Sequence, residues 1–309
     1  MKKKIDKSIN ELMDYSKKVY LKGKRISIYT VFKIFISKLI EDEIFEKSLA
    51  VAFSFTLAVF PAIIFLFTLI PYITNIIPEI DSDVIMNFLS QIMPQNMYDI
   101  TEETILDLVD TKRGGLLSIG VLSALFLSTN GFNTLIKTFN SCHRVEENRG
   151  FFKTRIIALI LTLISSFIAI FTIAVSIIGD IVITWLDENN LLIYGLDYYS
   201  IILAGIITLF IFFYLLITSM YYFAPAVHNK WNFFSTGATI AAIGCVGISL
   251  IFSFYLNNFS VYNKVYGSIG ALIAFMGYIY IFSSVLLVGF EWNTSIDLAI
   301  KKKFIDKKL

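Results

Sequence analysis

Six long apolar runs limit what this 309-residue chain can fold into. Each is about as long as the roughly 20 residues that a helix needs to cross the hydrocarbon core of a bilayer. The runs cover residues 48–73, 116–139, 156–178, 201–223, 233–256 and 267–290. In lipid, a helix satisfies its own backbone hydrogen bonds, and none of these runs alternates as barrel strands do. The sequence therefore predicts an all-α polytopic membrane protein with six transmembrane helices.

The composition excludes a soluble globular enzyme. Hydrophobic residues make up 56% of the chain and charged residues 16%. A soluble domain usually has about 45–50% apolar and about 25% charged residues. The net charge of +2 gives no overall basic field, so no nucleic-acid partner is expected.

The placement of the basic residues predicts the orientation of the spans. Of the 26 lysines and arginines, 23 fall on the side of the membrane that holds both termini, and 3 fall on the other side. Because cytoplasmic segments carry the excess of basic residues, both termini are predicted to be cytoplasmic. The expected parts are a cytoplasmic N-terminal segment (1–47), a six-helix membrane domain (48–292) and a basic cytoplasmic tail (293–309).

Two segments outside the spans have helical periodicity. Within 28–45, apolar residues such as Phe32, Phe35, Ile36, Leu39 and Ile40 repeat against a polar face with Lys33, Lys38 and Glu41. This pattern is typical of an amphipathic helix lying in the inner interface. A soluble helix packed on its own loop is the alternative. The outer loop (74–114) carries eight acidic residues and is predicted to form two short amphipathic helices.

The residues that enzymes use are sparse. His143 and His228 are the only histidines, and they are far apart in the sequence. Motifs for zinc hydrolysis, nucleotide phosphate binding and acyl transfer are missing from the sequence. We therefore predict no catalytic residues, no metal and no cofactor.

A polar cluster in the second span is the first candidate site. Asn130, Gly131 and Asn133 lie in its inner half, where a buried amide needs a partner on another helix or in water. The cluster could line a cavity, or it could only hold the helices together. Pro61 in the first span removes one backbone hydrogen bond, so it is a candidate hinge or a purely structural kink.

Glu291, at the inner end of the sixth span, is the second candidate. A carboxylate near the membrane is costly unless it is paired or lies at the interface. Arg149 and Arg155, predicted on the same side, are the candidate partners, and they could also attract an anionic head group.

Several motifs together resemble the YihY/BrkB family of bacterial inner-membrane proteins, in the right order over residues 39–299. They are Phe60-Pro61, Asn130-Gly131, Phe139-Asn140, Arg149-Gly150-Phe151-Phe152, Tyr222-Phe223-Ala224-Pro225, Tyr266-Gly267-Ser268 and Gly289-Phe290-Glu291-Trp292-Asn293. The resemblance implies six helices with both ends inside, and the bacterial inner membrane as the location. It does not imply an activity, although members have carried the label ribonuclease BN, a tRNA-processing nuclease, and a link to virulence.

The leading hypothesis is a transporter or flippase-like protein for a lipid or other amphiphile, without its own ATPase. Asn130, Asn133 and Glu291 would then line a cavity, and membrane lipids or an anionic amphiphile would be its partners. A second hypothesis is a non-enzymatic scaffold for envelope assembly that docks an envelope protein through the outer loop. A homo-oligomer is also compatible with the sequence, and a ribonuclease BN-type nuclease is the least supported alternative.

Overall fold

The computed structural model describes residues 26–73, 114–188, 196–227, 231–258 and 260–306, and every regular element longer than one residue in these segments is an α-helix. The prediction of an all-α fold is therefore confirmed for the described residues. The helices are α2 (Ile28–Glu41), α3 (Ile44–Ile73), α6 (Gly114–His143), α7 (Phe151–Glu188), α8 (Leu196–Phe223), α9 (Thr236–Asn258) and α10 (Ser260–Asp306).

Four of these helices, α7 to α10, contain segments long and apolar enough to cross a membrane. The segments are Phe151–Thr172, Leu203–Phe223, Thr236–Tyr255 and Ile273–Lys302. The first two predicted spans lie inside α3 and α6, which are continuous helices of 30 residues each. The predicted helices of the outer loop and the first 25 residues lie outside the described residues.

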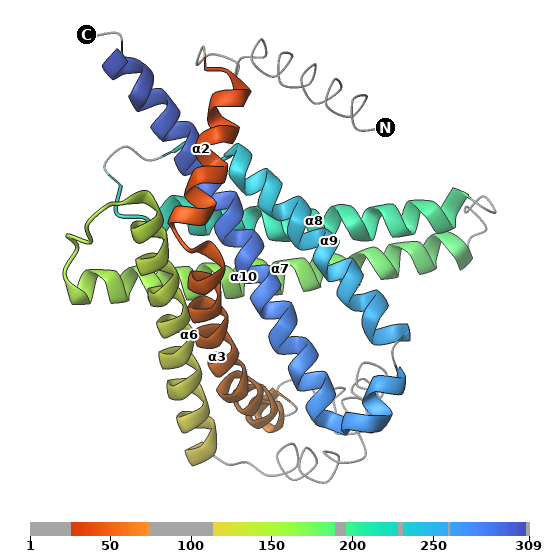
Figure 1. The fold of residues 1–309 in the computed structure, drawn as a ribbon. Coiled ribbons are helices and arrows are strands. Elements are labelled where there is room, and N and C mark those ends of the chain that lie inside the picture. The colour runs from red at the N-terminus through yellow and green to blue at the C-terminus, as the bar shows by residue number, and fades with distance from the viewer. Residues whose placement is uncertain (1–25, 74–113, 189–195, 228–230, 259, 307–309) are drawn as a thin grey trace.

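The helices do not form a parallel bundle. In Figure 1, α3 and α6 run side by side down the view, while α7 and α8 run together across it at a steep angle. Helix α10 passes behind α2 and packs against α9, α3, α2 and α6. The ribbon of α3 changes direction in its second half, the part that contains Pro61. The start of α2 and the end of α10 lie at the same end of the molecule.

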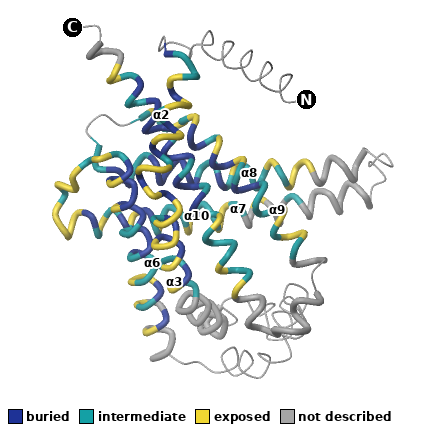
Figure 2. The backbone as a smooth tube through the Cα atoms, in the orientation of Figure 1, coloured by how far each residue is buried: buried dark blue, intermediate teal, exposed yellow. Residues whose placement is uncertain are grey.

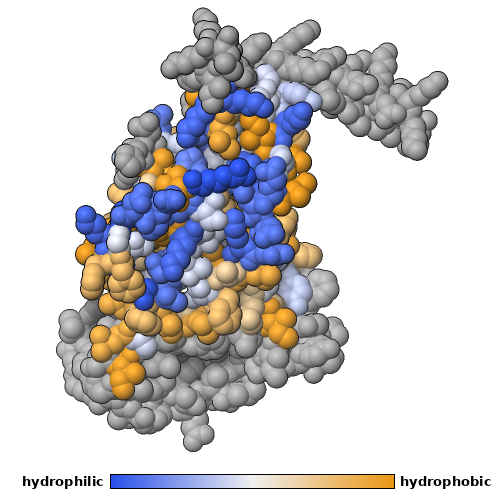
Figure 3. Space-filling view, turned by 60° about the vertical axis from the view of Figure 1, so that its left-hand side comes forward, coloured by the Kyte–Doolittle hydropathy of each residue, from blue (hydrophilic) through white to orange (hydrophobic). Residues whose placement is uncertain are grey.

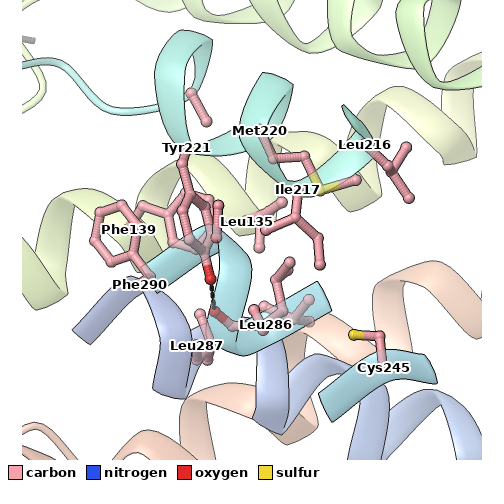
Figure 4. Packing of buried hydrophobic residues seen from close by; sticks show 14 of the residues in the cluster. Leu135, Phe139, Leu216, Ile217, Met220, Tyr221, Cys245, Leu286, Leu287 and Phe290 are labelled. Atoms are coloured by element: carbon pink, nitrogen blue, oxygen red, sulfur yellow. Dashed lines mark hydrogen bonds between the residues drawn. The ribbon is translucent and has the colours of Figure 1, made fainter. Parts of the chain in front are cut away.

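The buried core lies where α6, α8, α9 and α10 meet (Figure 2). Phe139 of α6 stacks on Phe290 of α10 with ring centroids 4.0 Å apart, and Tyr221 of α8 meets both rings edge-on. The Tyr221 hydroxyl donates a 2.5 Å hydrogen bond to the Leu286 carbonyl (Figure 4). Such aromatic pairs contribute about 0.5–1.5 kcal/mol beyond the area that they bury. These contacts fix the position of α10 along its axis relative to α6 and α8.

Small residues bring α9 and α10 into backbone contact. A Cβ atom added at Gly237 would lie 2.1 Å from the Gly289 carbonyl oxygen and 2.6 Å from the Asn293 side chain. The amide of Gly237 also donates a 2.9 Å hydrogen bond to Asn293 Oδ1. Close approach between small residues is the usual way in which helices associate in lipid.

Substitution of Gly237 by alanine should separate α9 from α10. We expect Gly237→Ala to lower the free energy of unfolding by about 1–3 kcal/mol, the usual cost of overpacking. The matched control is Gly247→Ala on the same helix, where an added Cβ would meet nothing within 4 Å. Thermal unfolding of the purified variants tests this, and equal stability of the two variants would contradict the contact.

Candidate functional site

Helix α2 turns its most apolar stripe away from the protein. It begins at Ser27, whose hydroxyl caps the helix by accepting a hydrogen bond from the Thr30 amide at 3.3 Å. Its buried residues are Val31, Phe35 and Lys38, which face α10. The side chains of Phe32, Ile36 and Ile40 are instead exposed.

A tight elbow joins α2 to α3 and fixes the position of the charged residues there. Asp42 is the C-cap of α2, and its amide donates to the Lys38 carbonyl at 2.9 Å. Glu43 follows with a φ of 48°, in the left-handed region that non-glycine residues rarely adopt. The Glu43 carbonyl accepts from the amides of Glu46 and Lys47 and so starts α3.

Lys38 connects three helices from a buried position. Its ammonium group donates to Asp42 Oδ2 at 2.7 Å and to the carbonyl of Cys142, at the end of α6, at 2.6 Å. It also forms an ion pair with Oε1 of Glu291 on α10. An ammonium group has three donors, so these three contacts use all of them. The Lys38 side chain is 4% exposed, and the positive charge also favours the negative end of the α6 dipole.

Glu291 is fully buried, and its two oxygens differ. Oε1 accepts from Lys38 and from the Thr294 hydroxyl, the latter at 2.9 Å. Oε2 has no hydrogen-bond partner among the described residues. Burying an unsatisfied polar atom costs free energy, and the cost is larger for a charged group. The partner of Glu291 is therefore Lys38, and the predicted pairing with Arg149 or Arg155 is wrong.

We call Lys38, Asp42 and Glu291 the Lys38 cluster. The residues around it range from buried to exposed. Arg144 bonds Glu41 at 3.1 Å and approaches Asp42 Oδ1 at 3.7 Å, with 61% of its side chain exposed. Burial, and then the nearby Glu291 carboxylate, raise the pKa of the Cys142 thiol to about 12. Burial lowers the pKa of His143, whose ring lies 3.6 Å from Asp297.

Arg149 holds the turn between α6 and α7 together. Its guanidinium donates to both oxygens of Glu147 at 2.7 Å and to the Ala224 carbonyl at 2.7 Å. Hydrogen bonding to Arg149 lowers the pKa of Glu147. Asn140 donates to Glu147 at 2.7 Å and accepts from the Ala226 amide at 2.8 Å. Two of the motifs of the sequence, around residues 140–149 and 222–225, are thus in direct contact.

The polar cluster of α6 lies away from Glu291. Asn130 accepts a 3.4 Å hydrogen bond from Arg155, whose guanidinium also lies 5.0 Å from the centre of the Phe126 ring. Gly131 packs against Phe55 of α3, since an added Cβ would lie 3.0 Å from that ring. Asn133 is half-buried on the same helix. A role for these residues in substrate contact stays a prediction.

A cavity of about 430 Å³ lies between α3, α6, α7, α8 and α10. Its walls are mainly aromatic and aliphatic, with a minority of hydroxyl groups. The aromatic residues are Phe55, Phe132, Phe212, Phe213, Phe275, Tyr278 and Phe282, and the hydroxyl residues beside them are Ser128, Thr162, Ser165, Ser166 and Ser283. Ser283 Oγ is buried and has no hydrogen-bond partner among the described residues. The residues that line this cavity include neither Asn130, Asn133 nor Glu291.

A second hollow of about 440 Å³ lies beside the α6–α7 turn. Arg149 lines it together with Ile157, Ile160, Phe223 and Pro225. Figure 3 shows a band of hydrophilic side chains that crosses this side of the molecule above a hydrophobic zone. Helix α6 and the start of α7, which lie on this side in Figure 1, carry the exposed charged residues Lys137 and Lys153.

Residues 35–308 match the family model described as virulence factor BrkB. The chain belongs to the virulence factor BrkB family. It is 29% identical over 252 residues to a Bacillus subtilis (strain 168) protein, YfkH, that is named ribonuclease-like; the match covers 80% of this chain and 88% of the relative. It is 21% identical over 288 residues to a UPF0761 membrane protein of Psychrobacter sp. (strain PRwf-1), covering 87% of this chain but 49% of the relative. No solved structure matches the chain.

The BrkB match and the apolar helices identify the chain as a membrane protein. The matched region of the BrkB model includes the Lys38 cluster, the α6–α7 turn and the cavity. Sequence reasoning missed Lys38 and Asp42, because Lys38 was assigned to the polar outer face of its helix. A helical wheel carries the missing signal, since Val31, Phe35 and Lys38 share one face. In the described part of this BrkB-family chain, His, Cys, Asp and Glu residues form no group of three that could hold a metal ion.

Removal of the Lys38 charge should destabilise the junction of the three helices. We expect Lys38→Met to lower the free energy of unfolding by about 3–5 kcal/mol, because it leaves buried carboxylates without their cation. Lys33→Met is the control, since Lys33 is exposed on the same helix and its loss should change the stability by less than about 0.5 kcal/mol.

A double variant separates the charge from the packing. Combining Lys38→Met with Glu291→Leu should recover part of the stability, because one of the two carboxylates that contact Lys38 is removed together with it, while Asp42 keeps only Arg144 at 3.7 Å. Denaturant unfolding of the four proteins measures this, and equal effects of Lys38→Met and Lys33→Met would refute the assigned role of Lys38.

Proposed function

We propose that this protein is a transporter or flippase-like protein for a lipid or other amphiphile, without its own ATPase. The cavity of about 430 Å³ is the observation that carries the proposal. Its volume lies in the range of about 300–1,000 Å³ that is typical of small-molecule sites, and such sites combine apolar walls with a few polar groups.

The chemistry of the walls favours an elongated ligand that is mostly apolar. Aromatic rings from α3, α6, α8 and α10 would contact a hydrocarbon chain, and the hydroxyls of Ser128, Thr162 and Ser166 would bond an ester or hydroxyl group on it. The partnerless hydroxyl of Ser283 is one more donor for such a group. Membrane lipids carry both kinds of chemistry in one molecule.

The hollow beside Arg149 is where we propose that a charged head group is received. Its walls are apolar apart from the arginine, as at the boundary between lipid tails and head groups. Arginine binds phosphate and carboxylate well because its donors form a rigid fork. Glu147 already engages this guanidinium, so an anionic head group would compete with Glu147 for it.

We further propose six spans with both termini in the cytoplasm, and the bacterial inner membrane as the location. The charge distribution and the common end of the molecule at which α2 starts and α10 ends support this orientation. The exposed stripe of Phe32, Ile36 and Ile40 supports α2 as an interfacial helix, because lipid would cover it. The change of direction in the second half of α3, the half that contains Pro61, fits the proposed hinge.

We propose that the protein is not an enzyme, although one relative is named ribonuclease-like. The buried and partly buried charged groups Lys38 and Glu291, and Arg149 and Glu147, are engaged in ion pairs with one another. Purified protein incubated with precursor tRNA should therefore leave the RNA intact, and specific cleavage that scales with protein concentration would overturn this proposal.

Filling the cavity should displace the bound amphiphile. We expect Ser128→Phe to retain about one tenth or less of the lipid that co-purifies with wild type, because the added ring occupies the space that a hydrocarbon chain would fill. The matched control is Ser123→Phe, on the same helix but outside the cavity lining. Native mass spectrometry of gently extracted protein measures the retained lipid.

The outcome discriminates between the candidate functions. Specific lipid that is held by wild type and Ser123→Phe but lost from Ser128→Phe supports a binding cavity. The same bulk lipid in all three proteins would contradict the proposal and favour the scaffold. In that case, deletion of residues 81–110 should abolish capture of an envelope partner.

A further inference from the structure

The buried cluster around Lys38 has more acid than base. One ammonium group contacts two carboxyl groups, those of Asp42 and Glu291, and all three side chains are at most 9% exposed. The third contact of the ammonium is the Cys142 carbonyl at the end of α6, which itself carries partial negative charge. With both carboxyls ionised, the cluster holds a net charge of −1 in a place that water hardly reaches. Such a charge is expensive to bury.

Other charged groups around the cluster do not neutralise Glu291. On the α2–α3 side, Arg144 approaches Asp42 and Glu41 from an exposed position, and Lys47 follows the elbow. On the α6 side, the thiol of Cys142 stays protonated because its pKa is about 12. The lowered pKa of His143 leaves its ring uncharged at neutral pH, and on α10 Asp297 pairs with Lys301 at 3.2 Å. None of these groups bonds Glu291 Oε2, which is buried without a partner.

We propose that Glu291 is the proton-binding site of this protein and that Oε2 is the atom that takes the proton. The step is a simple protonation: a proton from the cytoplasmic solution forms an O–H bond at Oε2, and no other bond breaks. The charge of the cluster changes from −1 to zero. The ion pair between Lys38 and Asp42 takes no part in this step.

Protonation would change which helices the cluster connects. Lys38 and Asp42 both belong to α2 and its C-cap, so their ion pair is internal to that segment. The Lys38–Glu291 pair is the ionic connection between α2 and α10 in this cluster. A neutral carboxyl accepts more weakly from an ammonium than a carboxylate does. Proton binding therefore loosens α2 from α10 at the level of Trp292, whose ring lies 5.2 Å from that of Phe35.

If the protein transports an amphiphile, this site supplies the coupling ion, and that part of the inference rests on the proposed function. The proton site itself does not rest on it. Glu291 is not part of the cavity lining, so proton binding and lipid binding can be measured separately.

Infrared difference spectroscopy of the full chain in lipid nanodiscs tests the site directly, without any substrate. We expect wild type to show a protonated-carboxyl band that titrates between about pH 4 and 9, the range in which perturbed carboxyls are found. Glu291→Gln should lose this band. Asp297→Asn, which removes a carboxyl at the rim of the same helix, should keep it with an unchanged midpoint.

A second variant tests the charge balance. Asp42→Asn leaves Lys38 and Glu291 as an even pair, so the proton affinity of Glu291 should fall about tenfold or more. The band should therefore titrate at lower pH than in wild type. Repeating the titration at two sodium concentrations separates proton binding from cation binding, because a midpoint that follows sodium would overturn the proposal.

Tryptophan fluorescence provides a measurement that does not depend on folding of Glu291→Gln. Replacing Trp185 and Trp231 by phenylalanine leaves Trp292 as the single tryptophan of the chain. Its emission should change with the same midpoint as the infrared band and shift together with it in Asp42→Asn. A titrating band that persists in Glu291→Gln, or a Trp292 emission that ignores pH, would refute the site.

Lipid retention in the same samples keeps the two proposals apart. Glu291→Gln should hold as much lipid as wild type, while Ser128→Phe should lose lipid and keep the titration. Loss of the titration with normal lipid retention in Glu291→Gln supports both proposals. Absence of specific lipid from wild type, with an intact titration, would overturn the transport function but not the proton site.

Discussion

The contact of one buried lysine with three helices organises the end of the molecule at which the described chain begins and ends. Lys38 holds α2 to the end of α6 and to the middle of α10. If only one of these contacts formed, a charged group or a carbonyl would be buried without a partner. The contacts therefore stabilise one another. The stacked rings of Phe139 and Phe290 lie close in the sequence to the two partners of Lys38, Cys142 on α6 and Glu291 on α10. The stack therefore fixes the position of α10 along α6 at the same level as the Lys38 contacts. Polar and apolar packing thus fix one junction together.

The rest of the fold spreads outward from this junction. The turn held by Arg149 and Asn140 connects the end of α6 to the end of α8, and Asn293 connects α10 to the start of α9. Farther from this end, the helices separate, and the cavity lies between them. A firm junction at one end with a hollow beyond it is an arrangement in which a change at the junction can alter the width of the hollow.

Much of this arrangement could be predicted from the sequence, and the remainder has physical reasons. Long apolar runs report helices directly, since backbone satisfaction in lipid leaves few alternatives, and all six predicted runs lie largely within helices. The steep angle of α7 and α8 to α3 and α6 could not be predicted, because crossing angles depend on which side chains interlock. The partner of Glu291 was missed for a related reason. Pairing was sought among the arginines predicted on the same side of the membrane, whereas the partner is Lys38, which lies 253 positions away on a helix that was predicted to lie apart from the spans.

The orphan oxygen of Glu291 explains why this carboxyl is more than a packing residue. A purely structural acid at this position would be expected to satisfy both oxygens, as Glu147 does with Arg149 and Asn140. Both carboxyls lie near the same end of α6, but Glu147 is partly exposed and Glu291 is fully buried. The two acids therefore have different roles. Glu147 stabilises a turn, whereas Oε2 of Glu291 has no hydrogen-bond partner and can accept a proton. Because the proton would enter where α2 meets α10, helix α2 is the element that responds to it.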